Sequence, residues 1–267
     1  MADKRKRSLC GLWNVADQTR IGEFALDPDW RQLSISPRGD RLAAAYRGKT
    51  VLWDLLERRI VSVLPGLSGY WHVVAFSPDG AYLAVTAENE LPEYRFKIWD
   101  MRTLRETATM AHQNHLTGLA FSPDGKTLAS SSLDGTARLW DVPSGREVLV
   151  LRGHKDFVRY VDWSPDGRTL LTCGDDRALR LWHVSTGRAL ISLGTAFDEP
   201  SDFAVFSPCG DSIVSGYRTS GHLSLFSASG GDELTATSPS LAGKQAWLSN
   251  WERLREVCRL NLLRGEQ

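Results

Sequence analysis

Two Gly-Lys-Thr triplets are the part of this sequence that comes closest to a motif for chemistry. Gly48-Lys49-Thr50 and Gly125-Lys126-Thr127 match the end of the glycine-rich loop that wraps nucleotide phosphates. That loop needs a further glycine five residues earlier, where this chain has Ala43 and Ala120. Both triplets also fall in predicted hairpin turns, so no helix is expected to point its first N–H groups at a phosphate. The sequence therefore does not support a nucleotide site.

A pair of histidines, His112 and His115, suggests a second kind of chemistry, because imidazole is a common zinc ligand. A three-residue spacing places the two side chains on opposite faces of a strand, which argues against shared ligation. The four cysteines lie far apart and form no Cys-x-x-Cys pair: Cys10, Cys173, Cys209 and Cys258. The sequence also lacks the Gly-x-Ser-x-Gly and His-Glu-x-x-His motifs of hydrolases and zinc proteases. We therefore expect no metal, no cofactor and no enzymatic activity.

The charge balance of the chain names no partner. Lys and Arg total 32, Asp and Glu total 32, and the formal net charge is zero. No whole-molecule field is then expected to attract nucleic acid or an anionic membrane. The basic run from Lys4 to Arg7 lies in residues 1–8, which we expect to be a disordered terminus, although such a run could also act as a nuclear-import or anionic-contact patch. Neither a signal peptide nor a membrane span is expected, and the cysteine usage favours a reducing, cytoplasmic location.

The elements that would position any functional residue are set by an internal repeat. A segment of the form apolar-Ser-Pro-x-Gly recurs roughly every 42 residues, and its copies begin at Ile35, Phe76, Phe121, Trp163 and Phe206. A second anchor follows each copy: Trp53-Asp54, Trp99-Asp100, Trp140-Asp141, Trp182-His183 and Phe226-Ser227, with Trp13-Asn14 one period earlier. Two independent anchors that keep one period indicate a repeat protein.

Each repeat is predicted to form four short antiparallel strands. In the repeat over residues 154–193, apolar segments are separated by turn residues and cover 157–163, 170–173, 178–182 and 188–193. Ser-Pro-Asp-Gly supplies the first turn, since proline fixes φ and glycine accepts a positive φ. One four-stranded sheet cannot bury both of its faces, so successive sheets must stack face to face.

The order Gly-His, Ser-Pro-Asp-Gly and Trp-Asp resembles the WD-repeat family of β-propellers, over roughly residues 9–240. The resemblance implies an all-β propeller with five complete four-stranded blades and an N-terminal half blade. It also implies a buried hydrogen-bond chain in two blades, because a buried indole N–H and a buried imidazole need partners. The residues of this hydrogen-bond chain would be His112, Ser130, Asp134 and Trp140 in one blade, and His154, Thr172, Asp176 and Trp182 in the next.

The other repeats depart from this pattern. Leu26, Leu67 and Ala196 stand at the histidine position, and Arg47, Glu93 and Ser220 stand at the turn aspartate. Their blades are expected to rely on packing and to be looser. The segment from Glu88 to Pro92 is predicted to be a lengthened connection between the second and third strands, and therefore a candidate contact loop.

The C-terminal residues 241–267 allow two interpretations. Trp247, Trp251, Leu254, Cys258 and Leu262 recur at the spacing of an amphipathic helix, with Ser249 or Asn250 as the N-cap. Alternatively, these residues supply the strands that close the ring beside residues 9–25. A helical tail would leave the N-terminal hairpin without its blade partners, and open sheet edges favour self-association. A piece of a longer propeller, or a fragment that completes the ring of another chain, would also fit.

The resemblance implies a non-enzymatic scaffold for protein–protein interaction, with the top-face loops contacting a protein or peptide partner. Exposed aromatic and arginine side chains are typical interface anchors. The candidates beside the first strands and in the second-to-third-strand turns are Tyr70, Trp71, His115, Phe157, Arg159, Asp175 and Arg177. Two alternatives remain open: a sensory or enzymatic propeller with a small ligand in its central channel, and the ring-completing fragment.

Overall fold

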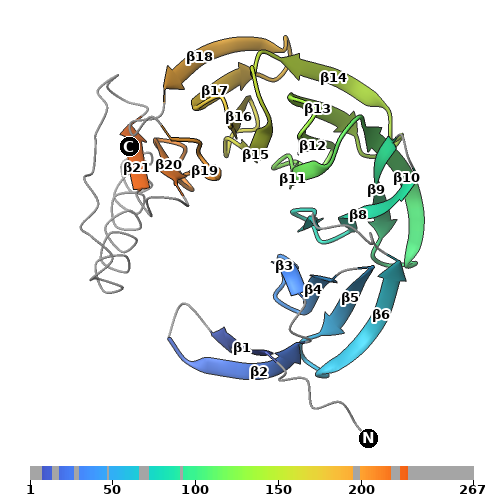
Figure 1. The fold of residues 1–267 in the computed structure, drawn as a ribbon. Helices are drawn as coiled ribbons and strands as arrows, with labels where there is room; N and C mark the ends of the chain where they lie inside the picture. Colours follow the sequence, from blue (N-terminus) through green and yellow to red (C-terminus); the bar gives the residue numbers. More distant parts are fainter. Residues whose placement is uncertain are drawn as a thin grey trace, which may run out of the picture. The chain divides into compact units, whose positions relative to one another are not determined.

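The computed structural model describes residues 8–13, 18–26, 30–46, 48–65, 72–90, 93–194, 199–217 and 223–227. These residues form β-strands joined by turns and contain no helix (Figure 1). A search of the same residues for a helix long and apolar enough to cross a membrane finds none. The chain divides into two compact units, residues 1–111 and residues 112–267.

The first unit contains a two-stranded hairpin and two four-stranded antiparallel sheets. The hairpin pairs β1 (Ser8–Trp13) with β2 (Arg20–Leu26). The next sheet contains β3 (Trp30–Ile35), β4 (Arg41–Tyr46), β5 (Lys49–Asp54) and β6 (Arg59–Pro65). The third contains β7 (Val74–Phe76), β8 (Tyr82–Glu90), β9 (Glu93–Asp100) and β10 (Arg105–His112), whose last residue is the first of the second unit.

The second unit contains two four-stranded sheets and one three-stranded sheet, again with neighbours in chain order. The first sheet contains β11 (Leu116–Phe121), β12 (Thr127–Ser132), β13 (Thr136–Asp141) and β14 (Glu147–Arg152). The second contains β15 (Val158–Trp163), β16 (Thr169–Gly174), β17 (Ala178–His183) and β18 (Arg188–Gly194). The third contains β19 (Phe203–Phe206), β20 (Ser212–Gly216) and β21 (Leu223–Ser227).

The all-β fold class and the four-stranded blade are confirmed, since four repeats each form the predicted antiparallel sheet. The N-terminal half blade is present as the β1–β2 hairpin. The fifth repeat shows three strands among its described residues, and its fourth strand would fall beyond residue 227. The basic segment 1–7 and the C-terminal segment 241–267 also lie outside the described residues, so both interpretations of the C-terminus stay open.

The segment from Glu88 to Pro92 was predicted to be a loop, which is wrong for Glu88 to Glu90, and Leu91 and Pro92 lie outside the described residues. Strand β8 continues to Glu90 and β9 begins at Glu93, with Asn89 paired to Tyr94 and Glu90 paired to Glu93. Backbone N–H and C=O groups pair whatever their side chains, so polar residues at the end of a hairpin can extend the ladder. The extra residues therefore lengthen the two strands.

The Ser-Pro-x-Gly segments fold as the predicted turns between the first and second strands. Ser122 Oγ donates to Asp124 Oδ1 at 2.6 Å and accepts from the Thr127 N–H at 3.0 Å. Gly125 has a φ of 71°, and its N–H donates to the Ser122 carbonyl at 2.8 Å. In the first copy the acceptor has moved, and Ser36 Oγ donates to Asp40 instead, at 2.6 Å. The repeat thus specifies the turn through a buried serine, which donates to a nearby carboxylate in the first four copies and contacts Cys209 Sγ in the fifth.

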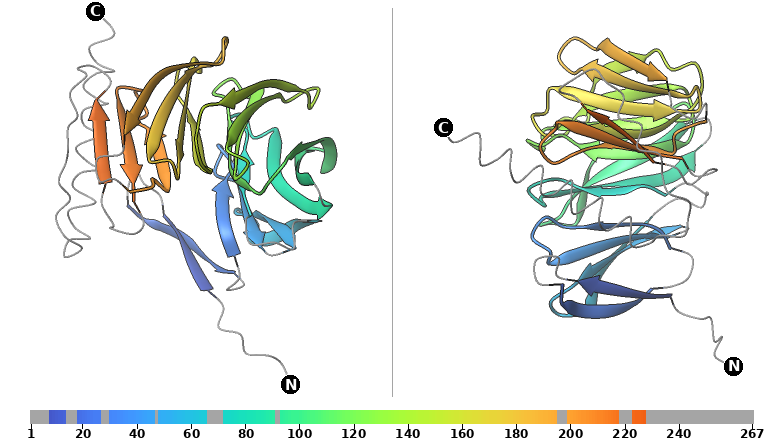
Figure 2. Two further views of the ribbon diagram at one scale, coloured as in Figure 1. Left: turned by 45° about the horizontal axis from the view of Figure 1, so that its top comes forward. Right: turned by 90° about the vertical axis from the view of Figure 1, so that its left-hand side faces the viewer.

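Neighbouring sheets lie side by side within each unit (Figure 2), and buried apolar side chains pack between them. In the second unit, Leu139 and Leu151 of one sheet pack in a buried cluster with Val161, Leu170 and Trp182 of the next. The second strands β12 and β16 are buried at every residue except the first. A strand that is buried on both faces has a continuous run of apolar or small residues, which explains the weak alternation in these segments.

Side-chain hydrogen bonds join the first strands of neighbouring sheets. In the first unit, the Phe76 N–H donates to Ser34 Oγ at 3.3 Å, and the Val74 N–H donates to Gln32 Oε1 at 2.9 Å. In the second unit, the Phe206 N–H donates to Asp162 Oδ2 at 2.8 Å. Ser34 and Asp162 both lie two residues before the turn serine, so the junctions use the same position of the repeat.

The substitution Ser34→Ala tests these junctions. It removes the acceptor of the Phe76 N–H, and we expect it to lower the free energy of unfolding by about 1–2 kcal/mol in urea titrations. The matched control is Ser62→Ala on the outer strand β6, which should change that free energy by less than about 0.5 kcal/mol. Equal effects of the two substitutions would show that the junction bond contributes nothing.

Candidate functional site

A buried polar chain crosses the sheet β11–β14. The Trp140 Nε1–H donates to Ser130 Oγ at 2.7 Å, and Ser130 Oγ lies 2.7 Å from His112 Nε2. His112 Nδ1 lies 2.9 Å from Asp134 Oδ2. This order assigns the imidazole proton to Nδ1, because Nε2 must accept from the serine hydroxyl if the serine accepts from the indole. Four residues separated in the sequence thus satisfy one another in the interior.

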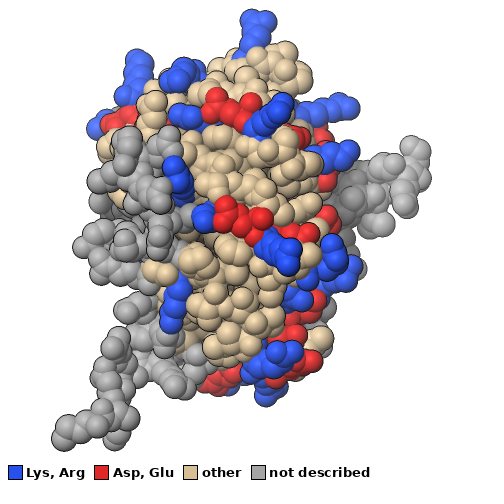
Figure 3. Space-filling view, turned by 90° about the vertical axis from the view of Figure 1, so that its right-hand side faces the viewer, with Lys and Arg blue, Asp and Glu red and all other residues tan. Residues whose placement is uncertain are grey.

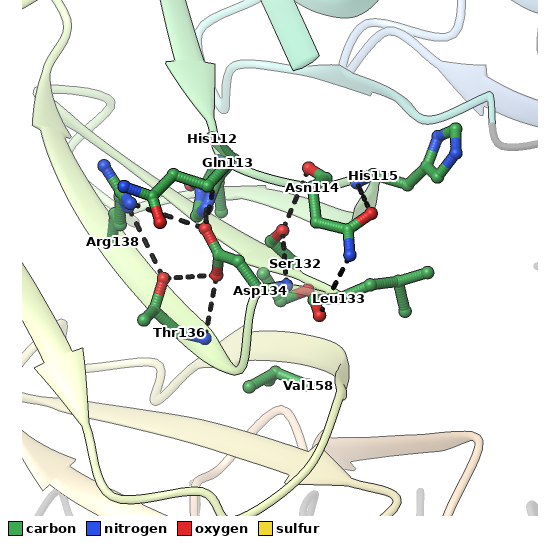
Figure 4. Close-up of polar contacts among 12 residues, drawn as sticks. His112, Gln113, Asn114, His115, Ser132, Leu133, Asp134, Thr136, Arg138 and Val158 are labelled. Atoms are coloured by element: carbon green, nitrogen blue, oxygen red, sulfur yellow. Dashed lines mark hydrogen bonds and ion pairs between the residues drawn. The ribbon is translucent and has the colours of Figure 1, made fainter. Parts of the chain in front are cut away.

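Electrostatics favour a neutral imidazole and a charged carboxylate in this chain. Burial lowers the pKa of His112, whose side chain has no exposed surface. Burial alone would raise the pKa of Asp134, but hydrogen bonds from His112 and Thr136 hold that pKa well below its ordinary value. Figure 4 shows Asp134 as the centre of this network, with Thr136 and Arg138 on its other side.

The sheet β15–β18 repeats the chain. The Trp182 Nε1–H donates to Thr172 Oγ1 at 2.8 Å, and Thr172 Oγ1 lies 2.8 Å from His154 Nε2. His154 Nδ1 lies 2.8 Å from Asp176 Oδ1. Burial lowers the pKa of His154, as it does for His112. Arg180 donates to Asp176 Oδ2 at 2.7 Å and closes the chain on its charged end.

Two sheets of the first unit keep the tryptophan but not its acceptor. Ser130 and Thr172 lie eight residues after the turn serine, and the same position holds Ala44 in one sheet and Val85 in the other. Trp53 and Trp99 occupy the register of Trp140, opposite the first leucine of the second strand. Among the described residues, the buried Nε1 atoms of Trp53 and Trp99 have no hydrogen-bond partner. The missing acceptor could have been predicted from the sequence, because Ala44 and Val85 stand at the repeat position of Ser130 and Thr172.

A second polar group lies at the start of β15 and in the β16–β17 turn. The Arg159 Nε and Nη2 atoms donate to the two oxygens of Asp175, a bidentate pair in which the Nε–Oδ1 distance is 2.7 Å. The guanidinium carbon lies 5.8 Å from the centroid of the Phe157 ring, which is 39% exposed. Hydrogen bonds with Asp175 raise the pKa of Arg159, burial opposes them, and the charges of Asp202 and Asp156 add to the rise.

Arg177 lies in the same turn as Asp175 and has a φ of 59°. The corresponding residue of the preceding sheet is Gly135, with a φ of 79°. An L-residue in the left-handed region costs roughly 1 kcal/mol relative to glycine. An exposed arginine is therefore held at a position where the local backbone favours glycine. We call Phe157, Arg159, Asp175 and Arg177 the Arg159 surface.

Of the remaining candidates, the structure describes His115. Burial lowers the pKa of His115, and its imidazole points away from the Asp134 network in Figure 4. Tyr70 and Trp71 lie outside the described residues. The contribution of Asp202, which precedes β19, to the charge around Arg159 was not predicted from the sequence, because no repeated motif marks its position.

Neither metal ligation nor surface charge identifies a further candidate site among the described residues. Within the described ranges, no group of three or more His, Cys, Asp or Glu side chains is arranged to hold a metal ion. On the face drawn in Figure 3, acidic and basic side chains lie beside one another. Lys97 pairs with Glu106 at 2.8 Å, and Arg138 pairs with Glu147 at 2.8 Å.

The substitution Thr172→Val tests the second polar chain at constant side-chain volume. It leaves the indole of Trp182 and the Nε2 atom of His154 without their shared hydroxyl, and we expect the free energy of unfolding to fall by about 2–4 kcal/mol. Thr169→Val, at the partly exposed start of the same strand, should cost less than about 1 kcal/mol. Urea unfolding of both variants gives the comparison, and similar losses would contradict it.

The two kinds of tryptophan should also respond differently to removal of the indole nitrogen. Trp182→Phe deletes a bonded N–H, whereas Trp99→Phe deletes one without a partner among the described residues. We expect Trp182→Phe to cost about 1–3 kcal/mol more stability than Trp99→Phe, measured by urea unfolding. A larger loss for Trp99→Phe would refute the assignment.

Comparisons with known proteins agree with this architecture. The family model described as WD domain, G-beta repeat, matches residues 104–141 and 145–183. An Arabidopsis thaliana protein named periodic tryptophan protein 2 is 31% identical over 127 residues, which cover 46% of this chain and 14% of that protein. The Oryza sativa small ribosomal subunit protein RACK1y is 32% identical over 119 residues, covering 41% of this chain and 34% of that protein. A Danio rerio WD repeat and SOCS box-containing protein is 40% identical over 91 residues, or 33% of this chain and 21% of that protein.

The chain thus spans between 14% and 34% of the length of these relatives. The two consecutive family matches cover β10–β13 and β14–β17, and they include every residue of the two polar chains. Repeat, sheet topology and family match agree, and residues 104–141 and 145–183 are two consecutive WD repeats.

Proposed function

We propose that this chain is a non-catalytic protein-interaction module that contacts a protein or peptide partner through the Arg159 surface. The observation that carries the proposal is the bidentate Arg159–Asp175 pair beside a partly exposed phenylalanine. Aromatic and arginine side chains are enriched among the residues that dominate binding free energy at protein interfaces. WD-repeat proteins typically serve as interaction scaffolds, which supports the same general function.

The Arg159 surface is suited to binding because it is held in place before a partner arrives. Asp175 fixes the plane of the Arg159 guanidinium, whose side chain keeps 21% of its surface exposed. The turn that carries Asp175 is anchored by the Asp175 N–H, which donates to the Phe157 carbonyl at 2.9 Å. A side chain ordered in the free protein loses less entropy on binding, so more of the contact energy appears as affinity.

Local chemistry must select the partner, because the chain has no net charge. Asp156 and Asp202 add negative charge near Arg159, whereas Arg177 adds an exposed positive charge in the turn. Such mixed charge favours orientation of a partner over simple electrostatic attraction. One relative carries the name of a small ribosomal subunit protein, so a place in a larger assembly is in keeping with the proposal.

The test compares two double charge reversals on the same sheet. Arg159→Glu/Arg177→Glu alters the proposed surface, and Arg168→Glu/Arg188→Glu makes an identical charge change at two exposed positions elsewhere, one in the turn before β16 and one at the start of β18. We expect proteins captured by the tagged wild-type chain to be lost at least tenfold with the first variant and kept with the second, by quantitative mass spectrometry.

Thermal unfolding of both variants serves as the folding control, and Phe157→Ala tests the same surface without a charge change. If all variants retain the same captured proteins, or if the Arg168→Glu/Arg188→Glu control loses them equally, the Arg159 surface is not the docking site.

A further inference from the structure

Thr117 is a residue of β11 whose hydroxyl reaches into the neighbouring sheet, next to the Arg159 surface. Its Oγ1 atom donates to the Val158 carbonyl at 2.6 Å and lies 2.9 Å from Ser131 Oγ. A hydroxyl has one proton to donate, and Thr117 gives its proton to the carbonyl, so the Ser131 hydroxyl must donate to Thr117 Oγ1. The order of donation is therefore Ser131, Thr117 and then the Val158 carbonyl.

The Val158 carbonyl belongs to the peptide group that joins Val158 to Arg159. Arg159 lies at a break in the register, because β15 gains one residue over β16 between Val158 and Tyr160. An extra residue of this kind, a β-bulge, changes the direction of its side chain relative to the regular strand. The orientation of the Val158–Arg159 peptide thus sets where the Arg159 side chain points, which is toward Asp175.

Thr117 lies at the same kind of bulge in the preceding sheet. Leu116 and Gly118 pair with consecutive residues of β12, so Thr117 is the extra residue of β11. Thr117 and Arg159 also occupy the same repeat position, five residues before the turn serine. The bulge in β11 therefore directs the Thr117 hydroxyl to the peptide group that forms the bulge in β15.

Gly118 leaves the room that the Ser131 hydroxyl needs. A Cβ atom at Gly118 would lie 2.7 Å from Ser131 Oγ, which is closer than real Cβ atoms approach another atom. The same repeat position carries Tyr160 in the next sheet and Phe203 in the sheet after that. Ser131 is fully buried, and the β-branched side chain of Thr117 has few rotamers. The sheet β11–β14 thus holds the Thr117 hydroxyl in one place.

We propose that Thr117 is a positioning residue for the Arg159 surface, because its hydroxyl fixes the Val158–Arg159 peptide and so holds the Arg159 guanidinium against Asp175. The inference rests on the proposed function where it concerns partner binding, but not where it concerns the order of Arg159. A side chain that is ordered before binding loses less entropy on binding. Loss of the Thr117 hydroxyl therefore weakens binding although Thr117 is not a residue of the Arg159 surface.

Exchange of the Arg159 Nε proton with water, followed by NMR in the full chain, measures this order without a partner. Arg159 donates that proton to Asp175 Oδ1 at 2.7 Å. Thr117→Val keeps the side-chain volume but removes the hydroxyl, and we expect it to speed the exchange by about fivefold. Thr117→Ser restores the hydroxyl and should stay within about twofold of the wild type.

Two controls separate positioning from a general loss of stability. Thr127→Val makes the same substitution at the partly exposed start of β12, and it should leave the Arg159 exchange within about twofold of the wild type. The Nε proton of Arg138, which is donated to Thr136 in the preceding sheet, should exchange equally in all variants. Equal Arg159 exchange in the wild type and Thr117→Val would overturn the proposal, as would a Thr117→Ser variant that exchanges as fast as Thr117→Val.

Protein capture by the tagged chain tests the consequence for binding. We expect Thr117→Val to retain about fivefold less of the captured proteins than the wild type, and Thr117→Ser to retain them. If Arg159→Glu/Arg177→Glu keeps those proteins, the proposed function fails, while the Nε exchange still decides the role of Thr117. If Thr117→Val keeps proteins that the double charge reversal loses, the order of Arg159 does not serve binding and the proposal is overturned.

Discussion

The structure depends on the need of each buried polar group for a hydrogen-bond partner in the interior. An indole N–H on the third strand reaches a hydroxyl on the second strand, and that hydroxyl reaches an imidazole held by a turn carboxylate. The hydrogen-bond chain joins His112, the first residue of the second unit, to the turn that precedes β13, which the backbone ladder alone would leave unconnected. An unsatisfied buried group costs about 1–3 kcal/mol, which is large against the stability of a domain.

The requirement of buried polar groups for hydrogen-bond partners also explains how the sheets differ. Where Ala44 and Val85 replace the hydroxyl, Trp53 and Trp99 still pack, but their nitrogens lack partners among the described residues. Those sheets rely on apolar contacts and on junction bonds that Gln32 and Ser34 accept. The sheets are thus stabilised to different degrees. The two sheets whose hydrogen-bond chains are complete also contain the family match.

Much of this fold was predictable, because the turns and the polar chains require particular residue types at a fixed period. Ser122, Asp124 and Gly125 each make a different contribution to one turn, and no single residue type could replace all three. The lengthened β8–β9 hairpin was not predictable from polarity, since backbone pairing there does not depend on the side chains. The roles of Asp162 and Asp202 were hidden because their partners lie in a neighbouring sheet or strand that only packing brings close.

The most direct test of the account is a double-mutant cycle between Trp182→Phe and Thr172→Val, with the free energy of unfolding measured for all four proteins. If the indole–hydroxyl bond is a supporting element of its sheet, the two substitutions should show a coupling free energy of about 1–2 kcal/mol. Additive effects, with coupling below about 0.3 kcal/mol, would contradict the account and would mean that packing alone holds the sheet.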